Sequence, residues 1–291
     1  MISFISNLLS DNLAGLAFFL SCAFIVSSLA YINKYYDLPY KRFKGPNIPL
    51  QTLFATFFIF ITFYFLVLPL FLSSIYRLIP QEFRKTYVLA GHIATFLITG
   101  IFLFIYCFKQ ERSEMLKIWK DKTFPNNLSL KEDLEIGFIS WVIAMPVVAS
   151  ITTLTEILVS LFLVSPEKNE QVAVKYLKNS LNDPGSTAVA FFSILVVAPF
   201  LEEFLFRGVL QSYFRKITGP MLAIFISSLI FSLFHFSPTQ GVENIPLLVT
   251  LFAFGSYLGF CYEKTRSLFT SIFLHVTFNS ISVIRIIFTH V

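Results

Sequence analysis

The chain has 291 residues, of which 56% are hydrophobic, 18% are aromatic and only 13% are charged. A soluble globular domain carries about 25% charged residues, so this composition excludes a soluble protein and predicts an integral membrane protein. The net charge of +5 is spread over connecting segments, without the basic block that nucleic-acid binding requires. The three cysteines are scattered through apolar segments, in no pattern typical of a disulfide framework or a metal site.

Eight apolar stretches are candidate membrane spans. A helix needs about 20 apolar residues to cross a bilayer, and most of the stretches reach that length. The first twelve residues carry no Lys or Arg, unlike a signal peptide, so the first stretch is expected to stay as a span. The predicted spans are 13–31, 52–73, 87–108, 137–164, 187–208, 220–236, 246–262 and 268–288. The sequence therefore predicts an all-α, polytopic membrane helix bundle of about eight transmembrane helices, with the catalytic core in the last four.

The polar connections carry two further expectations. The segment 109–136 mixes apolar and charged residues, which favours an amphipathic stretch lying partly along the membrane surface. The odd-numbered connections hold most of the Lys and Arg residues, which predicts that they are cytoplasmic and that both termini lie outside.

The stretch 197–211 places two adjacent carboxylates and an arginine in an otherwise apolar run. A charged side chain at the bilayer centre costs roughly 2.5–3.5 kcal/mol on insertion scales, so three in six residues indicate a site. On a helix, Glu203 and Arg207 share a face and can form an ion pair, while Glu202 points to a different neighbour. Pro199 is expected to loosen the helix just before them. The alternative is a structural ion pair with a spare Glu.

Two later spans add polar residues at matching depth. Glu202 and His235 lie at nearly equal distances along the chain from the turn near 217–219, so an antiparallel hairpin brings them level. A histidine beside an unpaired carboxylate can activate water. His275 and Asn279 share one face of the last span and could donate to an oxyanion. An interhelical polar clamp is the alternative for that pair.

In order on successive helices, the motifs Glu202-Glu-x-x-x-Arg207, Phe231-x-x-x-His235 and His275-x-x-x-Asn279 resemble the three motifs of the CPBP family. That family contains CAAX proteases and bacteriocin-processing (ABI) proteins, which are intramembrane glutamic endopeptidases. The resemblance covers 187–282, and we divide the chain into N-terminal spans at 1–186 and a catalytic core at 187–291. It implies that Glu202 and His235 activate water.

The resemblance further implies that His275 and Asn279 form an oxyanion hole, and that Glu203 and Arg207 hold the site in shape. The implied partners are a membrane-embedded or lipidated substrate, such as a prenylated C-a-a-X tail or a precursor peptide, and the lipid bilayer. The expected location is a cell membrane, if the source is bacterial. His275 is about eight residues into its span from Arg266, next to a connection assigned as cytoplasmic, so the site is expected to open to the cytoplasmic side.

Other interpretations compete with an endopeptidase. No cofactor is expected, although Glu202, Glu203, His235 and His275 could ligate zinc. Zinc is the weaker hypothesis because the sequence has no H-E-x-x-H motif and Arg207 would compete with a cation. A transporter would also place charges at mid-depth, but we find no inverted repeat. A non-catalytic immunity or scaffolding protein would be unaffected by loss of Glu202.

Two other charges in apolar spans, Glu156 and Arg285, are expected to reach similar depth near the outer face. They could form a buried ion pair that ties the N-terminal half to the catalytic half. Alternatively, each side chain extends separately to the membrane interface.

Overall fold

The computed structural model describes residues 2–38, 45–124, 128–163 and 171–290, and these residues form helices and no strand. Seven of the helical segments in this part of the chain are long and apolar enough to cross a membrane. The helix α10 (Pro220–Leu233) is shorter, as expected for the sixth span. The predicted all-α polytopic membrane bundle is confirmed, and the protein is a multi-pass integral membrane protein.

Among the described residues, three π-helical segments lie in two of the spans, and two short 3-10 turns join helices. The elements in chain order are α1 (Ile2–Ile32), α2 (Leu50–Ile61), η1 (Thr62–Val67, π), α3 (Leu68–Tyr76), η2 (Gln81–Phe83, 3-10), α4 (Arg84–Trp119), α5 (Leu130–Phe162), α6 (Val172–Ser180), α7 (Pro184–Phe192), η3 (Ser193–Val197, π), α8 (Ala198–Glu203), η4 (Phe204–Gln211, π), α9 (Ser212–Thr218), α10, η5 (Pro238–Glu243, 3-10), α11 (Asn244–Thr265) and α12 (Leu268–His290). Each of the eight predicted spans overlaps one of these helical segments, in the same order along the chain.

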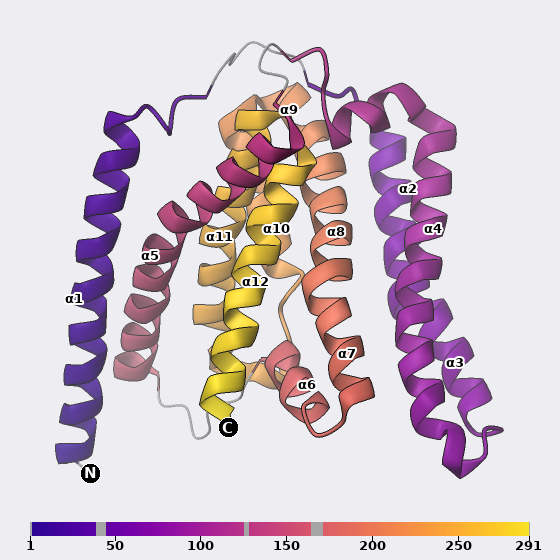
Figure 1. The fold of residues 1–291 in the computed structure, drawn as a ribbon, viewed down its shortest axis with the longest axis horizontal. Helices are drawn as coiled ribbons and strands as arrows, with labels where there is room; N and C mark the ends of the chain where they lie inside the picture. The colour runs from indigo at the N-terminus through magenta and orange to yellow at the C-terminus, as the bar shows by residue number, and fades with distance from the viewer. Residues whose placement is uncertain (1, 39–44, 125–127, 164–170, 291) are drawn as a thin grey trace.

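The C-terminal helices form the centre of the bundle, and the N-terminal helices flank it on two sides (Figure 1). The helix α5 packs against α1, α11 and α12, whereas α2 and α4 pack together and contact η4 on the other side. The start of α1 and the end of α12 lie on one side of the bundle, while the C-terminal ends of α1, α4, α9 and α11 lie on the opposite side. The N-terminal half therefore contributes to both flanks of the C-terminal helices.

The sequence predicts that the segment 109–136 is amphipathic and lies partly along the membrane surface. The helix α4 continues to Trp119, but the rings of Phe104 and Trp119 lie only 5.6 Å apart, so its last turns bend back toward the bundle. Met115 and Ile118 are fully buried in the main apolar cluster, whereas Arg112 is exposed, so this end of α4 is amphipathic; its place along a membrane surface stays a prediction. A second helix, α5, begins at Leu130, where Ser129 and Glu132 form a reciprocal capping box.

Two other connections are more ordered than predicted. The polar segment after Gln211 continues as α9 to Thr218, and the turn falls at Gly219 (φ 83°), directly before Pro220. A positive φ at this position favours glycine because other residues clash there. The segment between the fourth and fifth spans contains the short helix α6, which contacts α7 and α12.

The fifth span begins at a capped helix end. Asp183 accepts a hydrogen bond from the backbone N–H of Ser186, and Pro184 occupies the first turn, where its missing N–H has no cost. The Lys85 ammonium lies 2.6 Å from the Asp183 carboxylate. Hydrogen bonds from Lys85 and then from Ser186 lower the pKa of Asp183 to about 2. The third span and the start of the fifth are thus joined at this end of the bundle.

Pro199 loosens its helix as predicted. In η3, which ends two residues before Pro199, the N–H of Ala198 reaches back five residues to the Ser193 carbonyl instead of four. The same five-residue step from Pro199 would reach the Ile194 carbonyl, but proline has no N–H to donate. The Ile194 carbonyl therefore lacks a partner within its own helix. Such π-turns occur frequently at functional sites.

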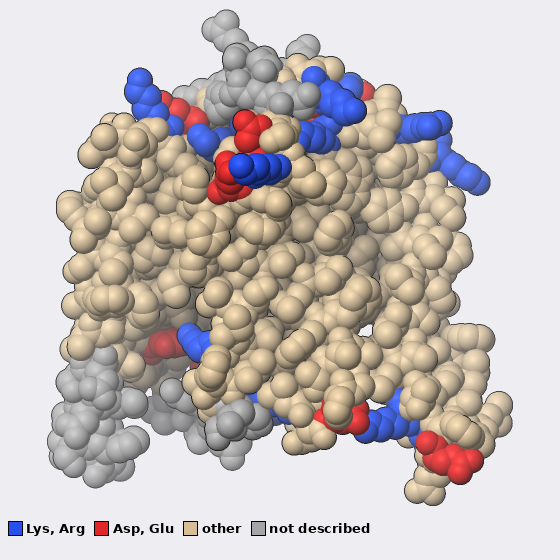
Figure 2. Space-filling model, viewed as in Figure 1, with Lys and Arg blue, Asp and Glu red and all other residues tan. Residues whose placement is uncertain are grey.

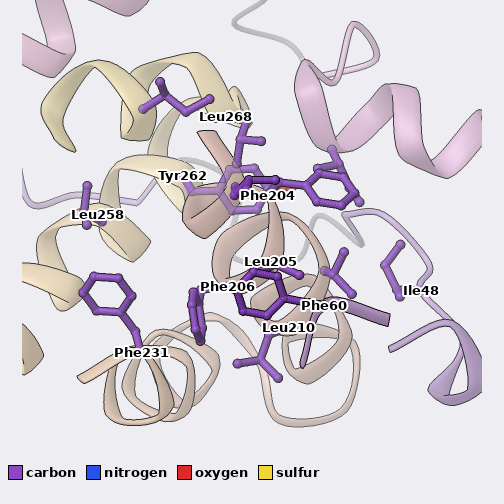
Figure 3. Close-up of a cluster of buried hydrophobic side chains, with 14 of the residues drawn as sticks. Ile48, Phe60, Phe204, Leu205, Phe206, Leu210, Phe231, Leu258, Tyr262 and Leu268 are labelled. Atoms are coloured by element: carbon purple, nitrogen blue, oxygen red, sulfur yellow. The ribbon is translucent and has the colours of Figure 1, made fainter. Parts of the chain in front are cut away.

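The largest apolar cluster surrounds the segment that follows the two carboxylates (Figure 3). Phe204, Leu205 and Phe206 are buried, and Phe206 meets the rings of Phe231 and Phe57 edge-on. Because lipid tails are as apolar as leucine, contacts of this kind hold membrane helices together by close packing and not by exclusion of water. Packing contacts with neighbouring helices thus hold the η4 segment in place.

Charged side chains gather toward the two ends of the bundle, and the middle of the face seen in Figure 2 is largely without them. Glu156 and Arg285 are both exposed in the structure. The hypothesis that they form a buried ion pair is therefore wrong, because neither charge is withdrawn from the surface of the bundle.

Candidate active site

The site is built around an ion pair within one helix. Arg207 Nη1 donates to Glu203 Oε1 over 3.0 Å, and both side chains are fully buried. Arg207 Nη2 donates to the Gly255 carbonyl on α11 over 3.1 Å, and the guanidinium lies over the Phe231 ring at 4.4 Å. Breaking such a buried pair strands a charge and costs about 3–5 kcal/mol. The spacing predicted this pair, and the surrounding contacts fix it in place.

His275 joins the same carboxylate from α12. Its Nδ1 lies 2.9 Å from Glu203 Oε1, so Nδ1 carries a proton and donates to the carboxylate. This contact sets the ring orientation and directs Nε2 away from Glu203. Glu203 therefore does more than pair with Arg207, because it also orients an imidazole on another helix.

Glu202 faces both histidines. Its Oε2 atom lies 3.8 Å from His275 Nε2 and 3.9 Å from His235 Nε2, both beyond direct hydrogen-bond distance. The Glu202 side chain is 23% exposed and that of His235 is 32% exposed, in contrast to the buried Glu203. One carboxylate oxygen thus lies between two imidazoles and is partly open.

The tautomer of neutral His235 follows from its own helix. Its Nδ1 lies 2.9 Å from the Phe231 carbonyl oxygen, which can only accept, so Nδ1 carries the proton. In the neutral ring, Nε2 is then the unprotonated nitrogen, and it is the one that faces Glu202. The arrangement therefore presents a carboxylate oxygen and an imidazole lone pair to the same space.

Asn279 has a different partner from the one expected. Its amide nitrogen donates to the Ile194 carbonyl over 2.9 Å, the carbonyl that Pro199 leaves without a helical partner. One N–H of Asn279 therefore ties α12 to η3. The amide has a second N–H, which is not part of this bond, and Asn279 lies one helical turn from His275.

A polar ladder continues from Arg207 along the helix. Gln211 Nε2 donates to the Gly259 carbonyl over 2.9 Å, one turn beyond the contact between Arg207 and Gly255. One turn further, Arg215 Nε donates to Glu263 over 2.7 Å. A β-carbon at Gly255 would lie 3.1 Å from Arg207, and one at Gly259 would lie 2.7 Å from Gln211. The two glycines thus allow the long side chains to reach the α11 backbone.

Sequence reasoning missed a polar group from the N-terminal half. Tyr64 lies on η1 in the second span, stacked on Phe60 with ring centroids 5.3 Å apart, and its phenol interacts electrostatically with Glu202. Phe57, two turns earlier on the same helix, packs against Phe206, one turn after Glu202. Because the second and fifth spans run in opposite directions, this contact places Tyr64 near the level of Glu202. A tyrosine among many aromatic residues gave no sequence signal.

The comparisons with known proteins locate the family within the chain. Residues 184–281 match the model of a family described as type II CAAX prenyl endopeptidase Rce1-like. The match covers about a third of the chain and agrees with the resemblance of the three motifs. All six predicted site residues lie in the matched segment, which is spread over α7–α12. The first four spans lie outside it.

A curated relative of the chain is the uncharacterized protein YpbD from Bacillus subtilis (strain 168). The two are 28% identical over 131 residues, which represent 42% of this chain and 64% of YpbD. The chain therefore spans somewhat less than two thirds of that relative. No solved structure matches the chain.

Proposed function

We propose that this protein is an intramembrane endopeptidase in which Glu202 and His235 activate water to cleave a membrane-associated peptide. One observation carries the proposal: the partly exposed Glu202 Oε2 lies between the Nε2 atoms of His235 and His275, while the buried Glu203 and Arg207 fix the array from behind. The Rce1-like family is a protease family, which supports a peptidase. A purely structural ion pair would not require the second carboxylate.

In the proposed reaction, a water bound at Glu202 attacks the carbonyl carbon of the scissile peptide bond. Glu202 takes one proton from the water, and the lone pair on His235 Nε2 accepts a hydrogen bond that holds the water in line. The attack converts the carbonyl into a tetrahedral oxyanion. The proton held by Glu202 then passes to the leaving amine as the C–N bond breaks.

The oxyanion needs donors that are already in place. His275 donates through Nδ1 to Glu203, so it can donate through Nε2 as well only when it is the imidazolium. The Glu203 carboxylate compensates that positive charge. The free N–H of Asn279 is the second donor. With Glu202 and Glu203 ionised and Arg207 and His275 protonated, the cluster has no net charge.

For the substrate, we propose a membrane-embedded or lipidated peptide, such as a prenylated C-a-a-X tail or a precursor peptide. The site lies within a bundle whose outer surface is largely apolar, with large exposed side chains such as Phe58 and Phe288. A substrate anchored in the bilayer would approach through lipid, where its local concentration is high. We propose that the protein resides in a cell membrane, with the site open to the cytoplasmic side.

The test compares membrane fractions from cells producing the wild-type protein with fractions from cells producing Glu202→Gln or His235→Ala at equal levels. Mass spectrometry of terminal peptides should reveal new carboxyl termini that require both residues. Cleavage by purified wild-type protein of a peptide matching such a terminus completes the assignment. Identical termini in all three samples would contradict a protease and favour a scaffolding role.

A further inference from the structure

Three polar atoms next to the Glu203–Arg207 pair are buried and have no hydrogen-bond partner among the described residues. They are Glu203 Oε2, Arg207 Nε and Ser228 Oγ. Leaving a buried donor or acceptor without a partner costs about 1–3 kcal/mol, and more for charged groups. Three such atoms in one place therefore indicate a common partner.

The three atoms belong to one small region. A β-carbon built at Gly255 would lie 3.1 Å from Arg207 Nη2 and 3.3 Å from Ser228 Cβ. Ser228 lies one turn before Phe231 on α10, and the Phe231 ring covers the Arg207 guanidinium at 4.4 Å. Ser228 and the Arg207 guanidinium thus lie side by side at Gly255, with the Phe231 ring next to them.

We infer that a single internal water is bound there, between the Ser228 hydroxyl and the Glu203–Arg207 pair. It donates to Glu203 Oε2, accepts from Arg207 Nε and completes its bonds with Ser228, which matches the usual two to four polar partners of a buried water. Apolar cavities stay dry, but this region offers an anionic acceptor and a cationic donor. The water is not the one that attacks the substrate, because Glu203 faces away from the open side.

This assignment makes Ser228 a positioning residue. Glu203 Oε1 accepts from both Arg207 and His275, so a partner on Oε2 fixes the rotation of the carboxylate. That rotation sets the direction of the His275 ring and of its Nε2. The effect on catalysis rests on the proposed function, whereas the water itself does not.

The direction in which Ser228→Ala shifts the midpoint of unfolding tests this inference. If the Ser228 hydroxyl has no partner, Ser228→Ala removes an unsatisfied group and raises the midpoint of unfolding. If the hydroxyl binds the water, Ser228→Ala removes one of the water's hydrogen-bond partners. The water then binds Glu203 and Arg207 less well, and the midpoint of unfolding falls. Ser232→Ala is the matched control, because the Ser232 hydroxyl on the same helix donates to its own Leu229 carbonyl. We expect a decrease for Ser228→Ala that exceeds that of the control; an increase, or equal shifts, overturns the inference.

A second experiment observes the site directly. A crystal structure of the full chain in lipid, at a resolution that shows ordered waters, should have density within about 2.7–3.2 Å of Ser228 Oγ and of an atom of the ion pair. An ordered site with a dry gap, and with the Ser228 hydroxyl turned to its own helix, overturns the inference. In cleavage assays, kcat of Ser228→Ala should fall roughly tenfold with KM unchanged, while Ser232→Ala stays near the wild-type values. Loss of kcat without the water would assign Ser228 a different role.

Discussion

The two buried carboxylates that pair with arginines of the fifth span, Glu203 and Glu263, differ in how completely their oxygens are bonded. Glu263 accepts from Gln211 on Oε1 and from both Arg215 and Arg266 on Oε2. Glu203 has two donors on Oε1 and no protein donor on Oε2. The neighbouring Glu202 lies beyond direct hydrogen-bond distance of both histidines.

Under the proposed function, the difference separates a structural cluster from a reactive one. Around Glu263, every carboxylate oxygen is bonded to protein, so nothing is left to take a proton or hold a ligand. Around Glu202, bonded groups fix the histidines while one carboxylate oxygen stays open. We therefore attribute the proposed reactivity to a carboxylate oxygen that is both without a close protein donor and partly exposed, as in Glu202, and not to the number of buried charges.

Removing the open carboxylate should affect the reaction alone. Glu202→Gln keeps the shape of the side chain and removes the base, so we expect a loss in rate of about 10²–10⁴ with an unchanged unfolding midpoint. The rate is measured on a membrane-anchored peptide with the enzyme in liposomes. Wild-type turnover by this variant would contradict the assignment of Glu202.

Removing the saturated carboxylate should affect folding. Glu263→Gln strands Arg215 and Arg266, and we expect a loss of about 3–5 kcal/mol in the free energy of unfolding. Chemical unfolding in detergent measures it, with Glu202→Gln as the control. Cleavage per folded molecule should stay within a few-fold of wild type, and a stable but inactive protein would show that the two clusters are not separate.

Asn279 should combine both kinds of effect. Asn279→Ala leaves the Ile194 carbonyl without its donor, so we expect a loss of about 1–3 kcal/mol in stability. Loss of its second N–H from the oxyanion should also lower the rate by about 10²–10³. His275→Ala should show a rate loss of the same size. If Asn279→Ala changes stability alone, its role is the interhelical clamp and not the oxyanion hole.

Tyr64 tests whether the reactive cluster extends into the N-terminal half. Tyr64→Phe keeps the ring stacked on Phe60 and removes only the hydroxyl near Glu202, so we expect a decrease in rate of roughly 2–10-fold. Tyr106→Phe, in the third span, is the control. Equal activity of the two variants would place the reactive cluster entirely in the C-terminal helices.

Metal removal should have no effect. Glu203 is occupied by Arg207 and His275, which leaves too few free ligands for zinc. We therefore expect unchanged cleavage after exhaustive dialysis against a chelator, measured against untreated enzyme. Activity that disappears on chelation and returns with stoichiometric zinc would replace the proposed mechanism.

Much of the fold could be predicted from the sequence, because membrane spans are long apolar runs and their ends carry polar residues. The pair of Glu203 and Arg207 follows from spacing within one helix. The bond from His275 to Glu203 does not, because it depends on how α12 rotates against α8. Asn279 was given a role by resemblance, whereas its partner in the structure depends on a π-turn that local sequence does not specify.

The extension of α4 shows a second limit of the sequence. The mixed pattern of 109–136 predicted an amphipathic stretch, but it did not predict that Met115 and Ile118 pack into the main cluster beside η4. A β-carbon at Gly208 would lie 2.6 Å from Ile118, so the fit depends on a glycine far away in the sequence. The burial of Met115 and Ile118 depends on contacts with η4, which the local sequence of α4 does not specify.

The polar ladder also determines how the fifth span and α11 slide along each other. The helices run in the same direction, and each rung joins residues 48 positions apart: Arg207 to Gly255, Gln211 to Gly259 and Arg215 to Glu263. A slip by one helical turn, about 5.4 Å, would offer Gln211 and Arg215 backbone carbonyls again, so these rungs alone barely oppose it. The carboxylate of Glu263 breaks that equivalence, because only one register brings it to Arg215. Glu263 thus favours one register at the Arg215 rung, and the contacts of Arg207 with Gly255 and Phe231 hold the same register two turns away.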